Sequence, residues 1–179
     1  MQVGCQPELP ISNPLEGDMQ VTAEMVRHAM RRWTTGVAVV TARLDEQIHG
    51  MTVNSFTSIS LEPPLVAVTL AAGTRTQSLV EQTGVFGITI LSEGQADISD
   101  RFAGRTPAGE DRFAGLETFE LESGVPLLRA GLVSLDCQVV HHYATETATL
   151  YVARVTAIQH TSEESPLVYH NRLYHKLGG

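Results

Sequence analysis

The first pattern along the chain has the period of an α-helix. Its apolar side chains recur three or four residues apart, and the basic side chains between them fall mostly on the other side. The apolar positions are Val26, Ala29, Met30 and Trp33. We therefore expect one amphipathic helix, capped by Thr22 and ended by Gly36.

The later apolar runs are short, rich in β-branched residues and bounded by turn residues, which is typical of strands. They cover residues 37–41, 65–70, 85–91, 132–142, 149–158 and 166–177, and a turn near Asp45 and Glu46 leads into one further strand. Apolar residues alternate along 132–142, and a polar turn separates this run from 149–158. We expect these two runs to form a hairpin.

Two more helices are predicted by the spacing of capping residues. Thr74 is followed three positions later by Gln77, and Ser92 is followed in the same way by Gln95. Gly84 is the expected end of the first of these helices, and the second is expected to run to about residue 102. The glycines, proline and charges between 103 and 124 then predict a long ordered loop.

Strands outnumber helices and do not alternate with them, which disfavours a doubly wound parallel sheet. A mainly β fold is expected, with an antiparallel barrel and a few short helices at its rim. The length of 179 residues suits one compact domain with its own core. We place that domain at 21–179, after an arm over 1–20 whose prolines and glycine predict flexibility.

Charge and composition exclude some classes of function. Twelve basic and twenty acidic residues give a net charge of −8, which disfavours a protein that binds nucleic acid with its whole surface, so any anion must be held at a local site. No apolar run approaches the roughly 18 to 20 residues of a membrane span. Two cysteines are too few for a disulfide framework, and Cys137 alternates with apolar residues as a core residue does, so a reducing cytoplasm is expected.

The segment 49–60, HGMTVNSFTSIS, gathers hydroxyl side chains and one amide between two apolar strands. Such a strip of donors and acceptors suits the edge of a planar heterocycle. The alternative is a polar turn at the edge of the barrel, since Ser, Thr and Asn favour turns for local reasons. The residues leave both interpretations open.

A second candidate site lies at the start of the helix predicted after Gly73. Free backbone amides at a helix N-terminus favour an anion, and Arg75 could add a bidentate contact to a phosphate. The alternative is a capped helix with a solvated arginine. The chain has no G-x-G-x-x-G after a strand and no P-loop, so neither common nucleotide motif is present.

Other chemistries are disfavoured. His141 and His142 are adjacent on a predicted strand and point to opposite faces, so one metal ion cannot easily bind both, and no metal site is expected. No nucleophile elbow accompanies the serines, which argues against a hydrolase.

Six segments in order resemble the short-chain flavin reductase family. They are WTTGVAVVT (33–41), GMTVNSFTSISLEPPLVAVTL (50–70), TRTQSL (74–79), DRFAG (100–104), DRFAG (111–115) and LVYHNRLYH (167–175). The resemblance spans roughly residues 22–177. It implies an FMN-binding split β-barrel of antiparallel, Greek-key type.

The resemblance also implies site residues. Those next to the flavin would be Thr35, Met51, Thr52, Val53, Asn54, Ser55, Ser58, Ser60, Phe102, Ala103 and Arg112. Its phosphate would be held by Thr74, Arg75 and Thr76, which agrees with the anion site read from the residues. The nicotinamide nucleotide would meet Tyr169, His170, Arg172 and Tyr174.

The implied activity is transfer of a hydride from NADH or NADPH to FMN or FAD, with reduced flavin passing to a partner monooxygenase. The resemblance also implies a homodimer, and alignment of the two rings requires no acid or base side chain. One segment departs from the family: its frequent Gly-Asp-His is replaced by Glu146, Thr147 and Ala148, and Arg154 stands in place of a common glutamate. Two alternatives follow, an FMN-bound oxidoreductase that acts on another substrate without efficient NADH use, and a flavin-binding module without turnover.

Overall fold

The computed structural model describes residues 20–105 and 111–177. Nearly all of the arm predicted over 1–20 therefore lies outside the described residues. The prediction of a mainly β, antiparallel fold with few helices is confirmed. Within the described ranges no helix is long and apolar enough to cross a membrane.

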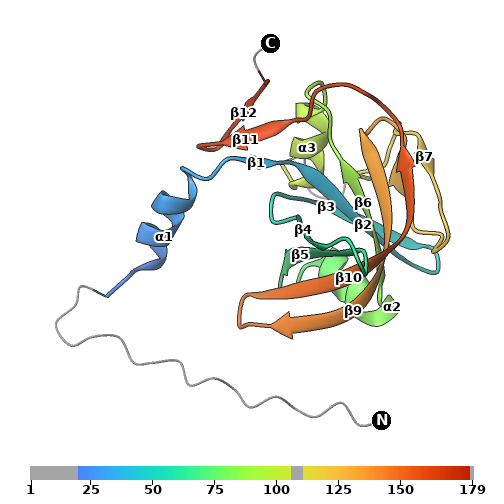
Figure 1. Cartoon of the computed structure of the whole chain (residues 1–179), viewed down its shortest axis with the longest axis horizontal. Helices are drawn as coiled ribbons and strands as arrows, with labels where there is room; N and C mark the ends of the chain where they lie inside the picture. Colours follow the sequence, from blue (N-terminus) through green and yellow to red (C-terminus); the bar gives the residue numbers. More distant parts are fainter. Residues whose placement is uncertain (1–19, 106–110, 178–179) are drawn as a thin grey trace, which may run out of the picture.

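The main sheet has seven strands in the order β3-β2-β6-β9-β10-β5-β4, and every neighbouring pair is antiparallel. The strands are β2 (Ala38–Leu44), β3 (Gln47–Val53), β4 (Thr57–Ser60), β5 (Leu65–Ala71), β6 (Val85–Ile90), β9 (Val133–Ala144) and β10 (Ala148–His160). β3 also contacts β5, which brings the two ends of the order together (Figure 1). β9 and β10 form the predicted hairpin, with Thr149 opposite Ala144.

Two small sheets complete the β structure. β1 (Thr35–Gly36), β11 (Val168–His170) and β12 (Leu173–His175) form one, and β7 (Thr118–Phe119) and β8 (Leu127–Leu128) form the other. The prediction of a single last strand and its exit within 166–177 was wrong, because Asn171 and Arg172 adopt positive φ angles of 48° and 65° and turn the chain back into a second strand. This turn creates the β11–β12 hairpin.

The helix α2 (Arg75–Thr83) begins and ends as predicted. The Thr74 side chain accepts a hydrogen bond from the backbone of Gln77, and Gly84 ends the helix in the left-handed conformation with φ 70°. In α3 (Ala96–Phe102) the N-cap is Gln95 rather than Ser92. The Gln95 amide accepts from the Ser92 backbone and donates to the Ala130 carbonyl, which holds residue 95 outside the helix.

The first helix, α1 (Ala23–Met30), differs from its prediction in length and in packing. It ends at Arg31 instead of continuing to Gly36, because Thr35 and Gly36 pair with β11 as a strand. None of its residues is buried, and it stands apart from the barrel (Figure 1). Its apolar stripe therefore has no partner within the described part of the chain.

The core has two parts on opposite faces of β2. Ala38, Val40 and Ala42 pack into one cluster with α2, whereas Val39 packs into the other with α3 and the C-terminal hairpin. Cys137 is a core residue as predicted, and burial raises the pKa of its thiol to about 12. Both faces of β2 are thus covered, and α2 and α3 flank neighbouring parts of β3.

Candidate functional site

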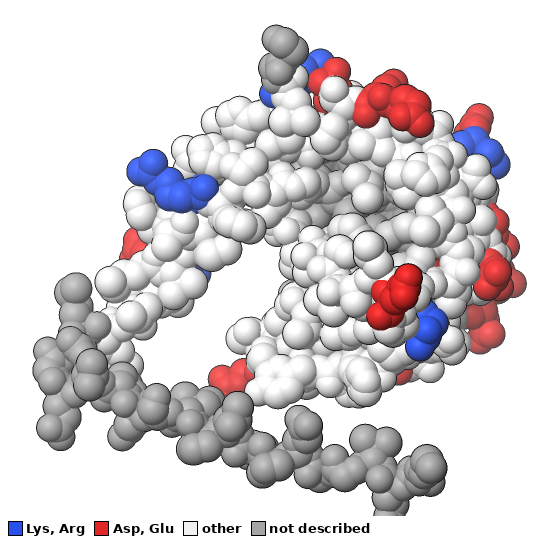
Figure 2. Space-filling view, viewed as in Figure 1, with Lys and Arg blue, Asp and Glu red and all other residues white. Residues whose placement is uncertain are grey.

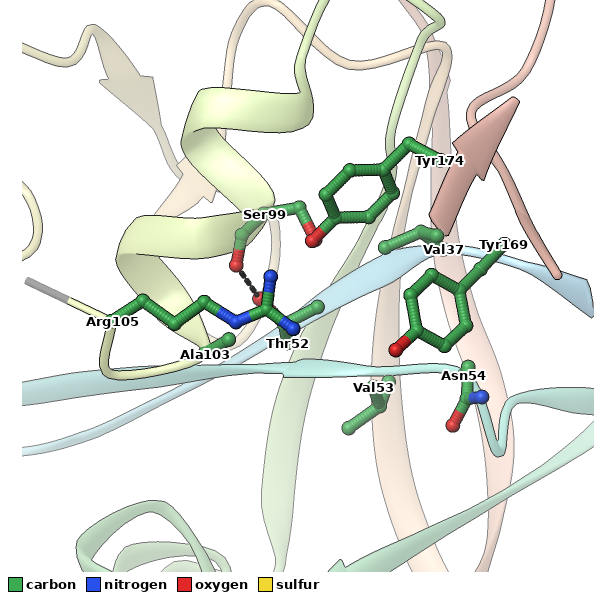
Figure 3. A pocket seen from close by; sticks show the side chains of 9 residues that line it. All are labelled: Val37, Thr52, Val53, Asn54, Ser99, Ala103, Arg105, Tyr169 and Tyr174. Carbon is green, nitrogen blue, oxygen red and sulfur yellow. Dashed lines mark hydrogen bonds between the residues drawn. The ribbon is translucent and has the colours of Figure 1, made fainter. Parts of the chain in front are cut away.

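Two cavities adjoin where β3 passes between the start of α2 and the end of α3. The larger has a volume of about 440 Å³, and its walls are His49, Met51, Thr52, Thr74, Arg75, Thr76, Phe102, Ala103 and Arg112. The smaller has a volume of about 160 Å³, and its walls are Val37, Thr52, Val53, Asn54, Ser99, Ala103, Arg105, Tyr169 and Tyr174 (Figure 3). Thr52 and Ala103 line both, so the two cavities are direct neighbours.

The larger cavity has the character of an anion site. Arg75 is the first residue of α2, so its guanidinium and the free amides of that helix turn lie at the same wall. Arg112 supplies a second guanidinium from the loop after α3, and no carboxylate is among the lining residues. The structure therefore brings Arg112, which the resemblance placed beside the flavin, to the same cavity as Thr74, Arg75 and Thr76.

Arg112 also has a structural task. Its Nη1 donates to the Gly50 carbonyl at 2.9 Å and to the Phe102 carbonyl at 3.0 Å. The first bond ties the loop to β3, and the second ties it to the end of α3. The guanidinium is thereby held in place at the wall of the cavity.

His49 is a residue that the sequence reasoning missed. Its Nδ1 lies 2.8 Å from the hydroxyl of Thr76, which is fully buried. Burial, together with the nearby positive charges of Arg112 and Arg75, lowers the pKa of His49 to about 4. The signal was available, since His49 and Met51 are two positions apart on a strand and so share a face.

The structure places the hydroxyl side chains of segment 49–60 in two different surroundings. Thr52 donates to the Ser99 carbonyl at 2.6 Å and so fastens β3 to α3 at the junction of the cavities. Ser55 bonds both backbone groups of Thr69, and Ser60 donates to the Pro63 carbonyl. Ser55, Ser58 and Ser60 line neither cavity, and their role in flavin binding stays a prediction.

Two tyrosines form one wall of the smaller cavity. Tyr169 comes from β11 and Tyr174 from β12, with ring centroids 5.5 Å apart; the Tyr169 ring points toward β3, and the Tyr174 ring points toward Ser99 on α3 (Figure 3). The Tyr174 hydroxyl lies 2.7 Å from Asp100 Oδ1, and Arg105 Nη1 lies at the same distance from that oxygen. Burial raises the pKa of Tyr174, so its phenol stays protonated at neutral pH. One carboxylate thus holds the hairpin and the end of α3 together.

Arg105 was also missed by the sequence reasoning. It lies in the loop after α3, just beyond the DRFAG motif (100–104), and only the fold brings it opposite Tyr169. Conversely, three predicted site residues besides Ser55, Ser58 and Ser60 line neither cavity. They are Thr35 in β1, His170 in β11 and Arg172 at the tip of the hairpin. Their roles stay predictions.

No group of three or more His, Cys, Asp or Glu residues that could hold a metal ion occurs in the described ranges. His141 and His142 pair with Val152 and Tyr151 across the hairpin and line neither cavity.

Comparison with known proteins decides the family. The flavin reductase like domain matches residues 30–178. The chain belongs to this family. The predicted resemblance is therefore confirmed, and the antiparallel barrel described above is a flavin reductase barrel.

Individual flavin reductases are similar over nearly the whole chain. An NADH-dependent flavin reductase from a Rhodococcus species is 36% identical and the alignment covers 90% of each chain. The reductase component of 4-hydroxyphenylacetate 3-monooxygenase from Thermus thermophilus is 35% identical, with 86% of this chain and 96% of that protein covered. The solved styrene monooxygenase flavin reductase from Pseudomonas putida S12 is 37% identical with a TM-score of 0.75, covering 85% and 96% of the two chains.

Proposed function

We propose that this flavin reductase uses NADH to reduce FMN or FAD and supplies the reduced flavin to a partner monooxygenase. The observation that carries the proposal is the pair of adjoining cavities, one walled by cations and the other by two tyrosines, with β3 between them. The similar proteins support it, since two of them are named as the reductases of monooxygenases and one as NADH-dependent. NADPH stays an alternative hydride donor.

The residues of the larger cavity fit the phosphate of a flavin nucleotide. Two guanidinium groups and a helix N-terminus face a space of about 440 Å³ without any carboxylate on its walls. Thr74, Arg75, Thr76 and Arg112 would hold the phosphate, and Met51, Thr52, Val53 and Asn54 would lie along the ring. A flavin bound there supplies the redox chemistry, as the acceptor of a hydride from nicotinamide.

The protein's own task is to bind and orient. Thr52 is fixed by its bond to Ser99, so the strand beside the ring cannot shift relative to α3. The amide of Asn54 is exposed at the rim of the smaller cavity and is free to bond a ligand. Tyr169 and Tyr174 offer two aromatic rings at the wall of the smaller cavity, which suits a nicotinamide nucleotide. None of these groups needs to exchange a proton for the rings to be aligned.

An alternative function rests on the β9–β10 turn. Ala148 begins β10 opposite Ala71, and the Thr147 carbonyl accepts from Ala72, so the turn lies next to the segment that leads into α2. An imidazole at position 148 would thus come near the anion site, and this chain has none there. An FMN-bound oxidoreductase without efficient NADH use, or a flavin-binding module, would result if nicotinamide binding depended on it.

One assay separates these functions. The purified protein is mixed with FMN or FAD and with NADH or NADPH, and the loss of nicotinamide absorbance is followed. With a flavin reductase present, NADH is oxidised by the flavin far faster than in the same mixture without the protein. No acceleration with any of the four pairs would contradict the proposal, and flavin retained on the protein would then favour the oxidoreductase or the binding module.

We also propose a homodimer, because α1 exposes an apolar stripe that the barrel does not cover. Val26, Met30 and Trp33 are 51%, 58% and 66% exposed, and open space separates α1 from the barrel (Figure 2). A helix of eight residues is unstable in water unless it packs against something. A second copy of this chain is the proposed partner surface.

The double variant Val26→Glu/Met30→Glu should shift the protein from dimer to monomer in sedimentation velocity. Two carboxylates would then have to be buried in the contact, which costs several kcal/mol. The control is His28→Glu, which lies on the opposite side of α1 and should leave the dimer intact. A wild-type protein that sediments as a monomer at micromolar concentration would overturn the proposal.

A cytoplasmic location completes the proposal. The chain has two cysteines, and Cys137 is a buried thiol in the core, which suits a reducing compartment.

A further inference from the structure

The walls of the larger cavity contain one titratable side chain that the proposed function does not use. His49 lies on β3 and lines the cavity together with Arg75 from α2 and Arg112 from the loop after α3. The remaining lining residues carry no charge and do not titrate near neutral pH. Three basic side chains from three separate segments thus face one space.

The imidazole is oriented by its bond to Thr76. Nδ1 lies 2.8 Å from the Thr76 hydroxyl, and this hydroxyl is buried and has no other hydrogen-bond partner among the described residues. Nε2 is the remaining ring nitrogen, and it is available to a ligand in the cavity. Since His49 is half-buried, its ring is in part exposed to that space.

The free protein holds this ring neutral. The pKa of His49 is lowered to about 4, chiefly by burial and in addition by the repulsion of the Arg112 and Arg75 guanidinium groups. A phosphate monoester carries close to two negative charges at neutral pH, since its second pKa is about 6. In the cavity it would cancel the field of Arg75 and Arg112 and would attract a proton to the imidazole.

We propose that His49 is a third phosphate-binding side chain, which takes up a proton from solvent when the phosphate of FMN binds and then contacts it as an imidazolium. The inference rests on the proposed function, because it assigns FMN to the larger cavity. In this step one proton from solvent binds to the His49 imidazole, and no bond within FMN breaks. By linkage, the site binds the dianion more tightly as pH falls from about 8 toward 6.5.

The test is the number of protons taken up when FMN binds. Calorimetric titrations at pH 7.5, in several phosphate-free buffers of different ionisation enthalpy, give this number for the wild type and for His49→Gln. Glutamine can keep a hydrogen bond to Thr76 but does not titrate. We expect uptake of a substantial fraction of one proton by the wild type, and close to none by His49→Gln.

Riboflavin is the matched control ligand, since it lacks the phosphate and should bind without proton uptake to either protein. The imidazole signal of His49 in the NMR spectrum gives a second measurement on the unaltered chain: it should report a neutral ring at pH 7 without ligand and an imidazolium with FMN.

The outcomes are distinguishable. If FMN binds to the wild type and to His49→Gln with equal proton uptake, or the ring stays neutral in the complex, the inference is overturned while the proposed function stands. If neither protein binds FMN and neither oxidises NADH with added flavin, the proposed function fails, and the inference fails with it.

Discussion

Replacement of Arg75 by alanine should weaken FMN binding by about tenfold to a hundredfold and leave riboflavin binding nearly unchanged. A charge-assisted hydrogen bond to a phosphate contributes roughly 1.5 to 3 kcal/mol, and FMN differs from riboflavin by that phosphate alone. Arg75 is the first residue of α2 and is exposed at the wall of the larger cavity, so its removal leaves no buried hole. Titration of flavin fluorescence measures both affinities.

The matched control is Arg154→Ala. Arg154 is an exposed arginine on β10 that lines neither cavity, so the same change of charge should leave both affinities as they are. Arg112 is a poorer choice, because its guanidinium also bonds the Gly50 and Phe102 carbonyls and its loss would disturb the walls. An equal loss for FMN and riboflavin in Arg75→Ala would mean that the phosphate lies elsewhere.

Local signals predicted the parts of the fold that local forces determine. The boundaries of α2 follow from Thr74 and Gly84, whose side chain and backbone form the expected caps. The β9–β10 hairpin follows from alternation around a polar turn. Each of these features depends on residues that are close together in the sequence, so it can be predicted from the sequence alone.

Features that depend on distant contacts were not predictable in the same way. α1 was expected to reach Gly36, but Thr35 and Gly36 instead pair with Tyr169 and Val168, more than 130 positions along the chain. The last run became a hairpin because Asn171 and Arg172 take positive φ angles that nothing nearby in the sequence requires. Tertiary pairing outweighed local propensity at both places.

The candidate site shows the same division. Arg75 could be predicted because a helix N-terminus is itself a place for an anion. The sequence could place His49 on the same strand face as Met51, but its contact with Thr76 and the position of Arg105 opposite Tyr169 depend on which distant segments meet in the fold. The family resemblance supplied residues within its own motifs, and these two positions lie just outside or at the edge of them.

A second substitution with a large expected effect is at Phe102, which the resemblance placed beside the flavin. Phe102→Ala should lower the free energy of unfolding by about 3 to 5 kcal/mol, measured by urea denaturation of the protein without flavin. Its ring is fully buried and meets the edge of Phe113 at 5.1 Å between centroids. A Cβ built on Gly50 would lie 2.7 Å from the same ring, so β3 packs closely against it. The surrounding residues would therefore leave a cavity where the ring is removed in Phe102→Ala.

Phe119→Ala is the control, because Phe119 is only partly buried, lies in β7 away from both cavities and should cost far less. Phe102→Leu, which keeps most of the volume, then separates packing from ligand contact. If Phe102 acts mainly through the core, excess FMN should stabilise wild type and Phe102→Leu by equal amounts. If Phe102→Ala lowered the free energy of unfolding by less than about 1 kcal/mol, this would contradict the place of Phe102 in the core and leave ligand contact as its main role. Removal of an aromatic ring from a packed core costs more than that.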